Sequence, residues 1–128
     1  TFLWTDPLTC TGLWLALEDA TEENGCLWAV PGSHLSTPVT RRFVRTGEKG
    51  ATGFVGGNDD GTTDYNTENG VPLVVKKGDL VLIHGGLVHY SFANTSDKSR
   101  HAFTIHLISG QAQYPADNWL HNDVLAKV

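Results

Sequence analysis

Short apolar segments, each ended by turn residues, constrain the fold of this chain more than any other feature. The first segment alternates leucines with Trp14 and Ala16, so one face of the expected strand is aliphatic and the other carries the tryptophan. Clusters of Gly, Pro, Asn and Asp separate the segments and indicate turns. The expected strands are residues 13–17, 26–30, 71–75, 80–84, 87–92 and 101–108. Short strands at this spacing predict an all-β sandwich or jelly roll.

A glycine-rich stretch interrupts this pattern in the middle of the chain. Residues 47–70 hold seven of the 14 glycines, together with many Asn, Asp and Thr residues. We therefore expect one domain over residues 1–128, with a loop insertion over residues 35–70 and a C-terminal extension over residues 111–128. Two interpretations of the insertion remain open, a solvated loop and a lid over a substrate, because long loops in compact domains are often functional.

Composition and charge argue against several classes of partner. The 128 residues carry a formal net charge of -5, which is unlike a protein that binds nucleic acid. The one basic cluster is Arg41, Arg42 and Arg45, which we interpret as a solvated loop edge in preference to a phosphate contact for a coenzyme-A-like substrate. Cys10 and Cys26 fit neither a metal spacing nor a disulfide framework, and we expect two small buried thiols.

The sequence shows no signal for secretion or for insertion into a membrane. It has no signal peptide, no transmembrane run and no terminal peroxisomal address. We therefore expect no membrane partner and an intracellular location. The cytoplasm is favoured, and the peroxisome remains the alternative.

A histidine and an arginine on neighbouring strands form the candidate site. His89 and Arg100 are eleven positions apart, with a turn between them that includes Asn94. Ser91 shares a strand face with His89, since side chains alternate along a strand. An imidazole is a ligand for iron(II), and a guanidinium offers two parallel hydrogen bonds to a carboxylate. The segment therefore predicts a metal ligand beside a carboxylate receptor. Taken alone, His89 would be read as a structural histidine.

The other histidines have plainer expected roles. His84 ends a strand before two glycines and is expected to be a hydrogen-bonded structural residue. His106 shares strand parity with Arg100, so it is expected to face the same side of the sheet. Exposed or loop positions are expected for His34, His101 and His121.

Five ordered blocks of sequence resemble the phytanoyl-CoA dioxygenase family. They are residues 14–28, Pro31-Gly32-Ser33-His34, Lys77-Gly78-Asp79-Leu80, residues 89–100, and Asn118-Trp119-Leu120. The resemblance implies a double-stranded β-helix of the cupin-like jelly-roll kind, with iron(II) as cofactor and 2-oxoglutarate as co-substrate. It also implies that His89 is the second iron-binding histidine and that Arg100, Ser91 and Trp14 contact 2-oxoglutarate. Without it, Trp14 would be assigned to core packing, and both roles are compatible.

The chain departs from the family pattern at its start. The family's first iron histidine and its carboxylate form a His-x-Asp motif, which should lie just before the segment that matches Thr1-Phe2-Leu3. No His-x-Asp occurs in the 128 residues, and Trp4-Thr5-Asp6 has the acid without the histidine. We therefore expect the C-terminal part of a family domain, incomplete at the N-terminus and inactive alone. Its partner would be the missing N-terminal part of the same domain.

The function expected for the complete protein is hydroxylation of a small-molecule substrate, such as an acyl-CoA or a lipid-like acid, coupled to conversion of 2-oxoglutarate to succinate. The competing class is a non-catalytic jelly-roll binding domain or pseudoenzyme that has lost metal binding. A cupin-like binder of a sugar or small acid is a third possibility, supported by fold analogy alone.

Strand parity makes a further prediction about the outer surface. If Arg100 faces the cavity, Ala102 and Thr104 share its side, and every second residue points the other way. The expected outward row is Leu13, Leu15, Leu17, Phe103, Ile105 and Leu107. A row of this kind is not a solvated face, and we expect the N-terminal part of the domain to cover it.

Overall fold

A computed structural model describes residues 1–47, 50–58 and 65–120 of the chain. Nearly all of its regular structure is strand, as the spacing of short apolar segments predicts. The elements are β1 (Thr11–Ala16), β2 (Leu27–Ala29), α1 (Ser33–Ser36), β3 (Arg41–Arg45), β4 (Thr52–Gly56), β5 (Val71–Leu73), β6 (Leu80–His84), β7 (His89–Ser91) and β8 (Ala102–Leu107). No helix in these ranges is long and apolar enough to cross a membrane.

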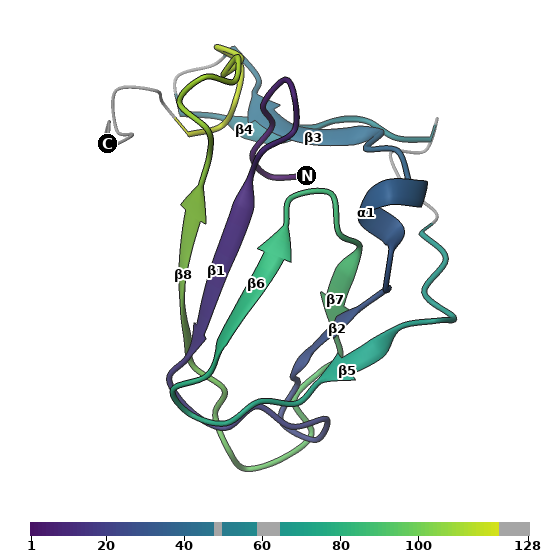
Figure 1. Ribbon diagram of the computed structural model, residues 1–128, viewed down its shortest axis with the longest axis vertical. Helices are drawn as coiled ribbons and strands as arrows, with labels where there is room; N and C mark the ends of the chain where they lie inside the picture. The colour runs from purple at the N-terminus through teal and green to yellow at the C-terminus, as the bar shows by residue number, and fades with distance from the viewer. Residues whose placement is uncertain (48–49, 59–64, 121–128) are drawn as a thin grey trace.

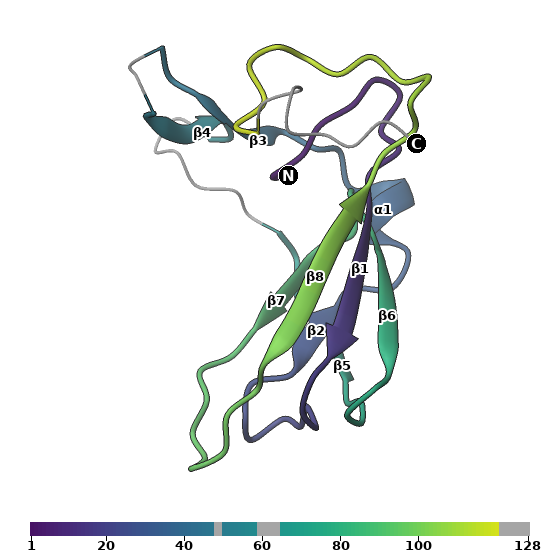
Figure 2. The same cartoon turned by 90° about the vertical axis from the view of Figure 1, so that its left-hand side faces the viewer.

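Two antiparallel sheets form the two layers of a jelly roll. One has the strand order β6-β1-β8 and the other the order β5-β2-β7. The two sheets lie apart in Figure 1, and the first stands in front of the second in Figure 2, so they face each other as two layers. The β3-β4 hairpin crosses one end of the two layers (Figure 1). The all-β, jelly-roll prediction is confirmed.

The side chains between the two sheets form a small core. The buried members are Trp14, Ala16, Ala20, Cys26 and Ile83. Alternation along β1 places Trp14 and Ala16 on the inner face. Both predicted buried thiols are found, since Cys10 and Cys26 are free cysteines buried in the structure.

The outer face of the β6-β1-β8 sheet is apolar and largely uncovered by the described residues. Leu13 pairs with Leu82 on β6 and with Ile105 on β8, so one apolar row crosses all three strands. The exposed members are Leu17 (43%), Leu80 (53%), Leu82 (64%), Phe103 (55%), Ile105 (44%) and Leu107 (52%). Leu13 and Leu15 are half-buried. The outward row predicted from strand parity is therefore confirmed.

The stretch expected as a loop insertion contains regular structure. Within residues 35–70, α1 ends and the strands β3 and β4 pair as a hairpin. Phe43 lies opposite Phe54 in the register, and the two ring centroids are 4.9 Å apart. Two of the five residues of β4 are glycines, which weaken strand patterns in a sequence. The expectation of a continuous loop was therefore wrong for this part of the insertion.

The C-terminal segment is tied to the beginning of the chain. Asn118 is fully buried; its side chain donates to the Trp4 carbonyl at 2.7 Å and accepts from the Trp4 N–H at 3.3 Å. Arg42 pairs with Asp117 at 2.7 Å, which joins the segment to β3. The extension predicted over residues 111–128 is described as far as Leu120, so His121 lies outside the described residues.

Candidate functional site

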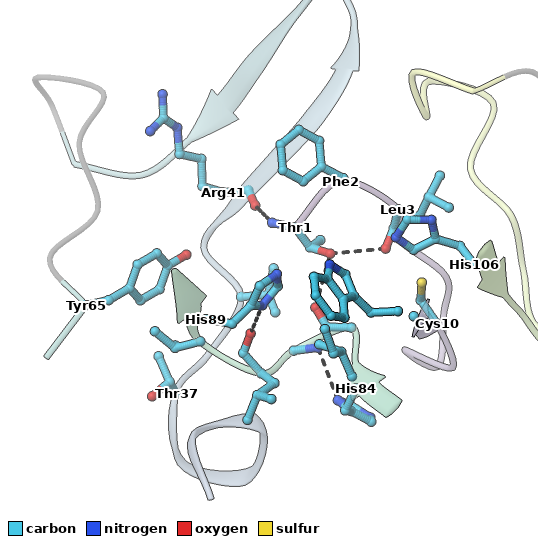
Figure 3. Close-up of a pocket in the computed structure, with 18 of the residues that line it drawn as sticks. Thr1, Phe2, Leu3, Cys10, Thr37, Arg41, Tyr65, His84, His89 and His106 are labelled. Carbon is cyan, nitrogen blue, oxygen red and sulfur yellow. Dashed lines mark hydrogen bonds between the residues drawn. The ribbon is translucent and has the colours of Figure 1, made fainter. Parts of the chain in front are cut away.

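His89 projects into a cavity of about 640 Å³ between the two sheets. Its Nδ1 lies 2.8 Å from the carbonyl oxygen of Leu87. Because a carbonyl oxygen can only accept, Nδ1 carries the proton in this contact and Nε2 presents its lone pair. Figure 3 shows the ring in the middle of the cavity, with the hydrogen-bonded nitrogen turned toward the chain and the other turned away from it. This is the orientation that metal-binding histidines adopt, since a backbone carbonyl commonly fixes their tautomer.

The cavity wall is mostly apolar and aromatic. The β6-β1-β8 sheet contributes Trp14 and Ile83, and the opposite sheet contributes Leu27 and His89. Trp14 is 7% exposed, so it serves as core packing and as cavity wall together. Among the described residues, no group of three or more His, Cys, Asp or Glu side chains converges in a way that could hold a metal ion. The described residues therefore do not complete a three-ligand site around His89.

Arg100 is joined to this cavity through Trp14. Its guanidinium carbon lies 5.6 Å from the centroid of a Trp14 ring, and its Nε donates to the carbonyl oxygen of Gly25 at 2.9 Å. The contact with Gly25 fixes the plane of the guanidinium and uses one of its five donors. The two terminal nitrogens have no hydrogen-bond partner among the described residues, so they are available to a ligand.

The four residues predicted for the site do not all line one cavity. His89 and Trp14 line it, whereas Arg100 and Ser91 are absent from its described lining. Arg100 contacts the ring of Trp14, which is part of the cavity wall. Ser91 follows His89 on β7, two residues along, and therefore shares its strand face. Their roles toward a metal and a co-substrate stay predictions.

A carboxylate outside the predicted set holds the residues on either side of Arg100. Glu18 accepts from the Ser99 hydroxyl at 2.9 Å, from the His101 N–H at 2.8 Å and from His101 Nδ1 at 3.0 Å. The backbone hydrogen bond from His101, helped by the Ser99 hydroxyl and the His101 ring, lowers the pKa of the Glu18 carboxyl. Alternation along the chain gives Glu18 the same parity as Trp14, which is the signal that could have indicated it.

Asn24 is a buried residue that also holds the backbone next to Arg100 in place. It is 4% exposed, and its amide donates to the carbonyl oxygens of Asp19 at 2.8 Å and Ser99 at 3.3 Å. Gly25 follows with φ 83°, and a Cβ there would stand 3.0 Å from the carbonyl oxygen of Phe92. Glycine is therefore the residue that fits this turn without strain, and the turn presents the carbonyl that Arg100 uses.

The remaining described histidines lie where the sequence pattern predicts. His84 Nδ1 accepts from the Gly86 N–H at 3.1 Å, which supports the expected structural role. His106 lines the cavity from β8, as its parity with Arg100 predicts. His34 and His101 are exposed. In Figure 3, His106 lies on the opposite side of the cavity from His89.

Solved structures with this architecture place the fold among iron- and 2-oxoglutarate-linked enzymes. The epimerase SnoN, in complex with Fe3+, alpha ketoglutarate and nogalamycin RO, superposes with a TM-score of 0.61 at 28% identity, over 88% of this chain and 40% of that one. The alpha-ketoglutarate-dependent carbocyclase SnoK gives a TM-score of 0.58 at 31% identity, over 82% of this chain and 38% of that one.

Sequence comparison narrows this class to one family. Residues 1–102 match the phytanoyl-CoA dioxygenase (PhyH) family, and the chain belongs to it. It is 50% identical over 125 residues to phytanoyl-CoA dioxygenase 1 of Oryza sativa subsp. japonica, covering 97% of this chain and 42% of that protein. It is 50% identical over 124 residues to phytanoyl-CoA dioxygenase domain-containing protein 1 of Danio rerio, covering 94% and 41%. The chain thus spans about two fifths of the length of these relatives.

Proposed function

We propose that this chain supplies the second iron-binding histidine and the co-substrate-binding residues of an iron(II)- and 2-oxoglutarate-dependent dioxygenase. The complete enzyme would hydroxylate a small molecule. One observation carries the proposal. His89 turns a free ring nitrogen into an apolar cavity whose wall includes Trp14, and Trp14 is in contact with a guanidinium that has free donors. This chemistry requires a metal ligand with a carboxylate receptor nearby.

The residues fit part of an iron site. The hydrogen bond from His89 Nδ1 to Leu87 suits an imidazole that binds metal through Nε2. A 2-His-1-carboxylate face needs two more ligands, and we propose that they come from the part of the family's length that the chain does not cover. When bound, iron(II) and 2-oxoglutarate supply the activation of dioxygen that a hydroxylation needs.

The side chains of this chain would then bind and orient the co-substrate. Arg100 has its Nε committed to Gly25, so its terminal nitrogens are the donors that would hold the far carboxylate of 2-oxoglutarate. The Ser91 hydroxyl would add a further hydrogen bond, and Trp14 would pack against the carbon chain. No side chain in this scheme acts as a proton-transfer base.

The runner-up function is a non-catalytic binding domain that keeps the jelly roll and its anion pocket. The observation that favours it is that the described residues include no group of three or more side chains that could hold a metal ion. For either function, we propose a small-molecule ligand such as an acyl-CoA or a lipid-like acid, and no nucleic acid as a partner.

Succinate production separates the two functions. The full-length protein and the 128-residue chain would each be incubated with iron(II), ascorbate and 2-oxoglutarate, with a metal-free sample as control. The proposal expects iron-dependent succinate from the full-length protein and none from the 128 residues, since one imidazole cannot supply the chelation of a three-ligand face. Succinate from neither sample, with 2-oxoglutarate still bound, would favour the binding domain.

A further inference from the structure

Ser33 is a buried residue whose hydroxyl contacts the backbone directly before His89. It is the first residue of α1 and is 2% exposed. Its Oγ accepts a hydrogen bond from the Val88 N–H at 2.9 Å, although the two residues are 55 positions apart in the chain. α1 lies next to the point where β7 begins (Figure 1), so this contact joins the helix to the strand that carries His89.

The local sequence fixes the position of Ser33. Gly32 adopts a φ of 76°, a left-handed conformation that side chains disfavour, at the turn between β2 and α1. The Ser33 N–H donates to the Val30 carbonyl at 3.2 Å, and the Ser33 carbonyl accepts from the Thr37 N–H at 2.8 Å. The backbone of Ser33 is therefore held on both sides, and its hydroxyl is presented to the neighbouring segment.

The Leu87–Val88 peptide unit connects Ser33 to the imidazole of His89. The Val88 N–H and the Leu87 carbonyl belong to this one planar unit, and in a trans peptide they point in opposite directions. The N–H donates to Ser33 at one edge of the plane, and the carbonyl oxygen lies 2.8 Å from His89 Nδ1 at the other edge. The hydrogen bond with Ser33 thus sets the direction of the carbonyl that orients the His89 ring.

The backbone groups on either side of this peptide unit are held by other backbone groups. The Leu87 N–H donates to the His84 carbonyl at 2.9 Å, and the Val88 carbonyl accepts from the Val30 N–H at 3.0 Å. Only the contact with the Val88 N–H, among these three, depends on the identity of a side chain. Replacing Ser33 by alanine would therefore keep the two backbone contacts and release the peptide plane that faces His89.

We propose that Ser33 is a positioning residue for His89, because it holds the peptide whose carbonyl keeps the ring proton on Nδ1 and leaves Nε2 free toward the cavity. Hydrogen bonds in series polarise one another, so donation from Val88 to Ser33 also makes the Leu87 oxygen a stronger acceptor. A neutral imidazole without this bias can carry its proton on either nitrogen. The consequence for a metal rests on the proposed function, whereas the tautomer of His89 does not.

Nitrogen-15 NMR of the metal-free, full-length protein tests this assignment. At about pH 8.5, where imidazoles are neutral, couplings between the ring protons and the ring nitrogens report which nitrogen carries the proton. His89→Ala identifies the signals of this ring. The wild type is expected to carry the proton on Nδ1, and Ser33→Ala is expected to shift the tautomer ratio toward Nε2–H by roughly threefold or more, since one hydrogen bond in the series is lost.

Two control variants separate positioning from general stability. Ser36→Ala removes an exposed hydroxyl from the same helix and is expected to leave the His89 tautomer unchanged. Thr5→Val removes a fully buried hydroxyl that accepts from the Thr9 N–H at 2.9 Å, so it should lower the unfolding temperature without changing the tautomer. An equal shift in Thr5→Val and Ser33→Ala would overturn the proposal. Wild-type His89 with its proton on Nε2 would overturn it without any variant.

Iron(II) titration distinguishes this inference from the proposed function. Ser33→Ala is expected to weaken iron(II) binding by roughly tenfold, as the loss of an outer contact to a metal-binding histidine does, and Ser36→Ala by less than about twofold. A tautomer shift in Ser33→Ala, with iron(II) bound normally by His89→Ala, would leave the positioning role standing and refute the iron site. Loss of iron(II) binding in His89→Ala, with tautomer and affinity unchanged in Ser33→Ala, would refute the role of Ser33 and leave the dioxygenase function in place.

Discussion

Arg100 donates from Nε to the carbonyl oxygen of Gly25 at 2.9 Å, and this contact connects the turn after β1 to the turn before β8. Gly25 has a positive φ of 83°, so the carbonyl is presented by a backbone conformation that side chains disfavour. The guanidinium is thus held by backbone at one edge and by the Trp14 ring on its face. It is oriented before any ligand arrives, which lowers the entropic cost of binding a carboxylate.

Replacing Arg100 by lysine should weaken 2-oxoglutarate binding in the full-length protein and leave iron(II) binding nearly intact. Lysine keeps the charge but loses the planar fork, so we expect a cost of about 1.5–3 kcal/mol in binding free energy. Arg42→Lys, on the β3-β4 hairpin, is the matched control. Calorimetric titration with 2-oxoglutarate measures the effect, and an unchanged affinity would count against the role of Arg100.

Glu18→Gln should loosen the segment that carries Arg100. The hydrogen bonds from His101 and Ser99 lower the pKa of the Glu18 carboxyl below its ordinary value of 4.5. A group with a lowered folded-state pKa contributes stability that is fully present above the unfolded-state pKa and is lost as the pH falls through the folded-state pKa. The variant is therefore expected to be less stable than the wild type at pH 7, with the difference shrinking as the pH falls below 4.5 and through the lowered folded-state pKa.

Glu23→Gln makes the same chemical change without this set of hydrogen bonds. Thermal unfolding of both variants between pH 3 and pH 7 gives the comparison. A positioning role for Glu18 further predicts weaker 2-oxoglutarate binding in Glu18→Gln, with Glu23→Gln unaffected. If the two variants have the same pH dependence of unfolding and the same affinity for 2-oxoglutarate, Glu18 has no special role.

The apolar outer face of the β6-β1-β8 sheet should make the 128-residue chain associate. Contiguous apolar surface of this kind is rare on monomeric proteins and is normally covered. Leu82 is 64% exposed on β6 in that face, whereas Leu35 is 85% exposed on α1 and lies outside it. Leu82→Ser should lower self-association measured by sedimentation, and Leu35→Ser should not. Equal sedimentation of both variants and the wild type would show that this face does not drive association.

The strand pattern was predictable where apolar alternation is strong. β6 was predicted with the bounds that are observed, and the expected segment 101–108 contains β8. The β3-β4 hairpin was missed because arginines and glycines hide its alternation and because the Phe43–Phe54 contact that stabilises it is visible only in three dimensions. Parity correctly assigned the inner and outer faces of β1 and β8, since it depends only on local geometry.

The residues of the candidate site were likewise predictable only in part from the sequence. The family blocks indicated His89, Ser91, Arg100 and Trp14, and the structure adds how His89 and Arg100 are oriented. Glu18 and Asn24 were missed because they act on Arg100 through Ser99 and His101, contacts that join residues more than 70 positions apart. Sequence spacing alone does not reveal supporting contacts over such separations.

Iron(II) binding by His89→Ala tests the central claim most directly. The claim is that His89 Nε2 is a metal ligand, so the full-length variant should lose more affinity than the roughly 10–100-fold that removing a mere supporting contact costs. His106→Ala, which removes a second imidazole from the same cavity, should bind iron(II) as the wild type does. Equal iron(II) affinities for the wild type and His89→Ala, measured by equilibrium titration under anaerobic conditions, would contradict the assignment of this chain to an iron site.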